Sequence, residues 1–149
     1  YSSVSALFAH RPGDRPMALD FRTIGLTALI ETGGRIVVNP GTDAVLLPRP
    51  AVAALAQGDQ WLPAWRDVAL RELLLVEASA ACSAITDLSI TYAGGGLTRV
   101  IVSVERSCIT GAANASAMKQ SLTQALSHVG ANRRLIASAD RVEIAPILV

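Results

Sequence analysis

The clearest alternation of apolar and polar positions covers residues 87–105. One arm places leucine, isoleucine and tyrosine at every second position, and the other arm does the same with valine. Between the arms stands the sequence Ala-Gly-Gly-Gly. Alternation with period two on both sides of a glycine-rich turn predicts a β-hairpin. We expect the face that carries Val100, Val102 and Val104 to belong to the core.

The chain before this hairpin predicts shorter elements. Residues 1–18 contain two prolines and a glycine within a few positions, which predicts an irregular lead-in. Residues 19–40 predict another hairpin, because an apolar run with threonines is followed by Gly33-Gly34 and then by Arg-Ile-Val-Val. A short apolar run follows at 44–47. Residues 51–57 predict a short helix that ends at Gly58.

Two longer helices and a final strand are predicted around the central hairpin. Residues 63–83 predict a helix whose charged residues do not gather on one face, so its amphipathicity is poor. Poor amphipathicity is typical of a helix that is covered on more than one side. Residues 116–129 predict a second helix with apolar residues at core spacing and Gly130 as its C-cap. Residues 108–115 predict a small polar loop, and residues 134–147 a strand or a bent pair of strands.

From residue 35 onward the predicted order is strand, helix, strand, strand, helix, strand. This order is typical of an α+β domain with a ferredoxin-like β-α-β-β-α-β sheet, antiparallel and with both helices on one face. The part before it, residues 1–31, would be an added N-terminal hairpin on that sheet. At 149 residues, the length predicts a single domain over residues 1–149.

The composition is apolar and poor in charge. Apolar residues make up 51% and charged residues 17%, and the net charge is +1. This balance gives no electrostatic reason to expect a nucleic acid partner. No apolar run reaches the roughly 18 residues of a membrane span. A surplus of apolar side chains indicates either faces that partner proteins cover or an alanine-rich core.

The two cysteines, Cys82 and Cys108, follow the first long helix and the second hairpin arm. If the hairpin folds back on that helix, both lie at the same end of the fold and can form a disulfide. A bridge would indicate a periplasmic or extracellular location, or a place in a virion. Two buried free thiols are the alternative.

No catalytic, cofactor-binding or metal-binding motif emerges from the sequence. His10 and His128 are far apart, and the cysteines lack metal-ligand spacing. Ser116-Ala-Met-Lys119 matches the Ser-x-x-Lys spacing of serine acyltransferases, but the companion motifs of those enzymes are absent. A helix-start serine and a solvated lysine explain the same four residues.

The residues with the strongest potential for a specific contact are Trp61, Trp65, Arg66 and Arg71. Tryptophan and arginine are enriched among the side chains that anchor protein interfaces. The tryptophans are four positions apart, which would place them on one helical face. A role in closing the core of the monomer is the alternative.

Two functions follow as hypotheses. The first is a non-enzymatic structural subunit, bacterial or phage, that packs with other protein subunits into an oligomeric assembly such as a secretion or pilus machine, a phage tail or a virion. The second is a small enzyme or ligand-binding domain whose site is assembled from residues distant in the sequence. The composition and the missing catalytic motifs favour the first.

Overall fold

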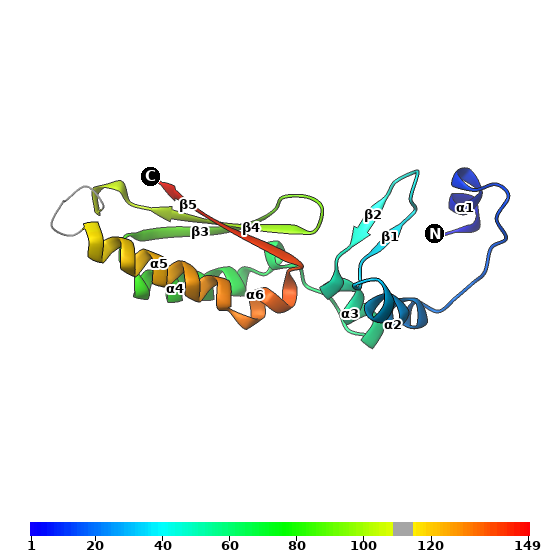
Figure 1. Ribbon diagram of the computed structural model, residues 1–149, viewed down its shortest axis with the longest axis horizontal. Helices are drawn as coiled ribbons and strands as arrows, with labels where there is room; N and C mark the ends of the chain where they lie inside the picture. The colour runs from blue at the N-terminus through cyan, green and yellow to red at the C-terminus, as the bar shows by residue number, and fades with distance from the viewer. Residues whose placement is uncertain (109–114) are drawn as a thin grey trace. The chain divides into compact units, whose positions relative to one another are not determined.

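The computed structural model describes residues 1–108 and 115–149 and has a mixed α+β architecture. Its residues form two compact units, which we call unit 1 (Tyr1–Trp61) and unit 2 (Leu62–Val149). The described part contains six α-helices and two small sheets (Figure 1). The α+β class is confirmed. The single domain over residues 1–149 stays a prediction, and most of the polar loop predicted at 108–115 lies outside the described residues.

Unit 1 consists of three helices and a two-stranded antiparallel sheet. Its elements are α1 (Val4–His10), α2 (Phe21–Glu31), β1 (Ile36–Val38), β2 (Val45–Leu47) and α3 (Arg49–Gln57). Helices α2 and α3 pack against each other where Gly25 meets Ala56, and a Cβ atom at Gly25 would lie only 2.9 Å from that alanine. The predicted short helix with Gly58 as its left-handed cap is confirmed by α3.

Two predictions for unit 1 were wrong. The segment expected to be irregular contains α1, which Ser3 caps by accepting a hydrogen bond from the Ala6 N–H. The first arm of the expected hairpin at 19–40 is the helix α2. Small residues at helical spacing face α3 there, and the glycine pair at 33–34, with φ of +72° and +80°, follows the end of a helix instead of turning a hairpin.

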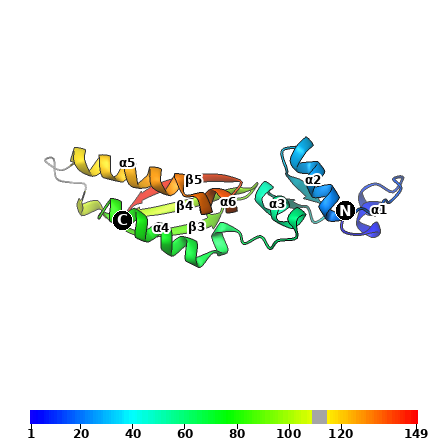
Figure 2. The same cartoon turned by 90° about the horizontal axis from the view of Figure 1, so that it is seen from below.

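Unit 2 places two long helices against one face of a three-stranded sheet. Its helices are η1 (Ala64–Arg66), α4 (Val68–Ala81), η2 (Arg106–Cys108), α5 (Ala115–Ala131) and α6 (Arg133–Ser138), and its strands are β3 (Ile85–Tyr92), β4 (Leu97–Val104) and β5 (Arg141–Leu148). The strand order is β3-β4-β5, with β3 antiparallel and β5 parallel to β4. Both α4 and α5 lie on the same side of the sheet, as the two views show (Figures 1 and 2).

The central hairpin and its inner face are confirmed. Strands β3 and β4 pair so that Leu88 lies opposite Val102 and Ile90 opposite Val100. The three valines predicted for the core, Val100, Val102 and Val104, are fully buried. They pack with apolar side chains from the helices, namely Leu70, Leu74, Ala78, Ala125, Val129 and Leu135.

The described strands do not reproduce the complete ferredoxin-like order. The strand β1, expected beside the central hairpin, pairs with β2 in unit 1 instead. In unit 2 the last strand β5 lies next to β4 and runs parallel to it, so the sheet is mixed rather than antiparallel. The stretch predicted as a strand or a bent pair of strands at 134–147 begins with α6, whose N-cap Asn132 accepts hydrogen bonds from the N–H groups of Arg134 and Leu135.

Candidate functional site

The start of α4 holds the most buried charged group of unit 2, the carboxylate of Asp67. Its side chain caps the helix by accepting a hydrogen bond from the Leu70 N–H at 3.0 Å. Arg134, which belongs to α6, donates to both carboxylate oxygens at 2.8 and 2.9 Å. The carboxylate is 6% exposed and its oxygens are occupied. This group therefore fastens α6 to the start of α4 and has no free oxygen directed at a substrate.

The outer edge of β3 is covered by Arg71. Its Nε donates to the carbonyl oxygen of Leu88 at 2.7 Å, and its terminal nitrogen lies 2.6 Å from a carboxylate oxygen of Asp87. A free carbonyl on an edge strand is a place where another strand could pair. Arg71 occupies that place from α4, so one of the predicted interface residues protects a sheet edge.

The opposite edge of the sheet, on β5, is interrupted by Pro146. Arg141 and Val149 donate their N–H groups to carbonyls on the β4 side. Because N–H directions alternate along a strand, the nitrogen of Pro146 points to the outer edge. Proline has no N–H to offer there, and prolines on edge strands are a common obstacle to strand addition. Both edges of this sheet therefore resist pairing with another strand.

The helix α4 has a second apolar face, directed away from the sheet. Ala69, Leu73, Val76 and Ala80 are exposed on it, with Val76 66% and Leu73 40% accessible. We call these four residues the outer stripe. The neighbouring helix α5 differs, because most of its exposed positions carry polar side chains, among them Lys119, Gln120, Thr123, Gln124 and Ser127. The sequence predicts that this helix is covered on more than one side, but it does not identify the four residues of the outer stripe.

The two tryptophans do not share a helical face. Trp61 precedes η1 in a segment without regular structure, whereas Trp65 lies within η1. The Trp65 ring lies against Tyr92 at 4.7 Å between centroids, and it packs against the hydrophobic core of unit 2. Arg66 is exposed beside it. Interface roles for Trp61, Trp65, Arg66 and Arg71 stay predictions.

The two cysteines join the same hydrophobic cluster. Cys82 is buried at the end of α4, with its sulfur 3.6 Å from the Met118 sulfur, and Cys108 is half-buried at the end of η2. Both thiols are free in the structure. The disulfide stays a prediction.

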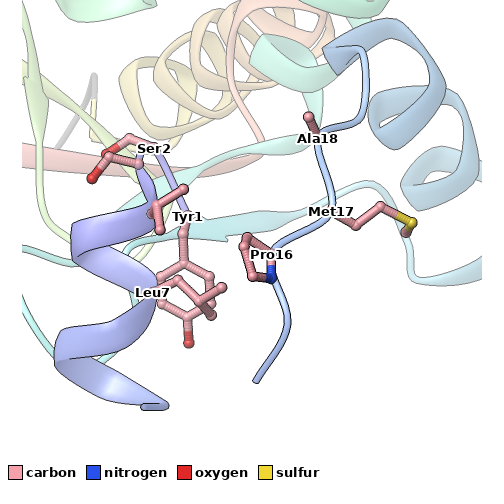
Figure 3. Close-up of a pocket in the computed structure, with 8 residues that line it drawn as sticks. Tyr1, Ser2, Leu7, Pro16, Met17 and Ala18 are labelled. Carbon is pink, nitrogen blue, oxygen red and sulfur yellow. The ribbon is translucent and has the colours of Figure 1, made fainter. Parts of the chain in front are cut away.

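A depression of about 470 Å³ lies in unit 1, between the start of α1 and residues 16–18. Figure 3 shows the Tyr1 ring beside Leu7, with Pro16 across from them. The Tyr1 hydroxyl lies 2.6 Å from Nδ1 of His10. The lining side chains are mostly apolar and include no carboxylate or lysine.

Polar groups line a shallower depression over α5, formed by Ser116, Lys119, Gln120, Thr123 and Gln124. It contains the Ser-x-x-Lys pair of the sequence. Among the described residues, no three side chains of the types that bind metals come together. None of the helices in the described ranges is long and apolar enough to cross a membrane.

Comparison with known proteins gives no relative: no protein family, no curated protein and no solved structure matches this chain. The site must therefore be judged from its own geometry. Of the surfaces described above, the outer stripe is apolar, continuous and built on a regular helix. An exposed apolar surface of this kind is suited to contact with another protein.

Proposed function

We propose that this chain is a non-enzymatic structural subunit that packs into a larger protein complex. The observation that carries the proposal is the outer stripe of α4, which exposes Leu73 and Val76 although the helix already buries Leu70 and Leu74 against the sheet. A surface helix of a monomer normally has one apolar face. A second apolar face supports a contact with another protein.

Unit 1 supports the same proposal through its small core. Its buried apolar residues are Leu7, Ala28, Ala51, Val52 and Ala56, and three of the five are alanines. Larger side chains remain accessible, with Met17 76% and Ile30 82% exposed. A unit of this size needs more buried apolar surface or an external support to be stable. A partner subunit would supply that support.

The proposed complex is of the kind found in secretion or pilus machines, phage tails or virions. We also propose that unit 2 is related to the ferredoxin-like fold. In that fold the first strand of the domain lies beside the second strand of the central hairpin, and in unit 2 β5 lies at that position, beside β4. The sheet then has edges that resist strand pairing, which favours contacts through helix faces.

The mass of the native particle tests the proposal. The tagged chain is isolated from its source under mild conditions, and the mass of the particle is measured by light scattering after size exclusion. A regular particle several times the mass of the chain is expected. A monomer would contradict the proposal and favour the alternative, an enzyme or ligand-binding domain with its site over α5 at Ser116 and Lys119.

A further inference from the structure

We propose that the outer stripe of α4 pairs with the outer stripe of a second copy of this chain, with the two helices antiparallel about a two-fold axis. The inference rests on the proposed function and names the partner for one of its surfaces.

The spacing of the outer stripe is that of a helix–helix seam. Its members follow one another at intervals of four, three and four residues, from Ala69 to Ala80. Apolar residues at alternating intervals of three and four are the pattern by which two helices interlock side by side. The interval continues through almost the whole of α4, so the seam is as long as the helix permits.

The sizes of the side chains suit a contact between identical helices. Alanines stand at the two ends of the stripe, and Leu73 and Val76 stand near its centre. In an antiparallel pair about a two-fold axis, Ala69 meets the partner's Ala80, and Leu73 meets the partner's Val76. A two-fold interface requires such reciprocal contacts. The order of side-chain sizes along the stripe therefore allows two identical helices to pack antiparallel.

The charges beside the stripe decide between the two directions. Glu72 and Glu77 stand on opposite flanks of the seam. In a parallel pair these flanks meet across the seam, which would bring Glu72 of each copy against the partner's Glu77. In an antiparallel pair like flanks meet, and Glu72 lies nearest to the partner's Ser79, with the two Glu72 residues about 7.5 Å apart along the axis. The antiparallel pair therefore has the weaker repulsion of the two.

Strand addition does not compete with this contact in unit 2. Arg71 covers the edge carbonyl of Leu88, and Pro146 removes a donor from the other edge. The outward face of α5 is polar. Among these surfaces the outer stripe has the lowest free-energy cost of desolvation, because its side chains are apolar.

The pair is expected to be weak on its own. A helix of 14 residues is about 21 Å long. Stable interfaces bury about 1,200–2,000 Å² in total. The area that two helices of this length can bury against each other lies at or below the lower end of that range. Association of the purified chain should therefore appear at high protein concentration.

The contact is tested by placing a charge in the stripe of the full chain. Val76→Glu changes a residue that is exposed in the monomer, so folding should be retained, whereas association should weaken at least tenfold. The matched control is Thr123→Glu, which adds the same charge to the exposed side of α5. Sedimentation velocity over a concentration series measures association, and thermal melting checks that both variants fold equally well.

The direction is tested by disulfide trapping with single variants Ala69→Cys and Ala80→Cys. In the antiparallel pair, the mixture of the two variants forms a cross-linked heterodimer. Each variant alone forms none, because two Ala69 positions lie about 16.5 Å apart along the axis. The unchanged chain, which keeps Cys82 and Cys108, gives the background. Cross-linking of each variant alone would show a parallel pair and overturn the inference.

The remaining outcomes separate this inference from the proposed function. Oligomers that Val76→Glu does not weaken, with no cross-link in the mixture, would show assembly through another face, so the inference would fail and the structural role would stand. A purified chain that stays monomeric at all concentrations also overturns the inference. The structural role fails only when the particle isolated from its source is a monomer too.

Discussion

Two adjacent leucines on α4 offer the sharpest test of how this helix is used. Leu74 is fully buried under the sheet, whereas Leu73 is 40% exposed in the outer stripe. Truncation of a fully buried leucine to alanine costs about 2–5 kcal/mol, because the transfer energy is lost and a cavity remains. For Leu73→Ala we expect a cost of about 1 kcal/mol or less, because much of that side chain is already in water.

The two variants are compared by urea unfolding in a Trp61→Phe background. Trp65, which lies against Tyr92 in unit 2, then reports on that unit alone. With a slope of about 1–3 kcal/mol/M, Leu74→Ala should lower the midpoint by roughly 1 M or more, and Leu73→Ala by much less. The protein is kept dilute, because association would add stability to the unchanged chain.

The urea midpoints of the two variants distinguish a core role of Leu73 from a surface role. If Leu73→Ala lowers the midpoint as much as Leu74→Ala in dilute protein, the outer stripe is part of the core and not a surface for a partner. If Leu73→Ala leaves the midpoint unchanged but weakens association at high concentration, the two faces of α4 have the two roles described above.

Three further predictions follow from the core, the helix cap and the aromatic contact. Val102→Asp should unfold unit 2, because an unpaired charge would replace a fully buried side chain; a variant with unchanged melting would show that the sheet faces are reversed. Asp67→Ala should cost about 1–3 kcal/mol in urea unfolding, since Leu70 loses its cap and Arg134 its partner; an unchanged midpoint would contradict this. Trp65→Ala should lower monomer stability with association intact if the contact with Tyr92 is structural, and lower association alone if Trp65 anchors an interface.

The parts of the fold that the sequence predicted are those with local signals. The central hairpin is encoded by its own alternation and by the three glycines of its turn, all of which have positive φ. The helix α3 is marked by Gly58, and the face with Val102 follows directly from the period of the strand. None of these elements depends on a distant partner for its identity.

The parts that were missed depend on distant contacts. The run of apolar residues and threonines in α2 is compatible with a strand or a helix, and its close approach to Ala56 of α3 through Gly25 is not visible in the segment itself. The parallel pairing of β5 with β4 joins strands far apart in the sequence. The connection between these strands ends with the short helix α6, which Asn132 caps, and the apolar residues of α6 are equally compatible with a strand.

The missed outer stripe has a different cause. The sequence of the helix at 63–83 is poorly amphipathic, which is what two apolar faces on one helix produce, because each face reduces the contrast that the other creates. Leu70 and Leu74 belong to the face toward the sheet, and Leu73 and Val76 to the face away from it. Only the structure separates the two. Weak amphipathicity in a helix that still folds against a sheet is therefore a signal in its own right, since the second apolar face has to be covered by something other than the core beneath the first.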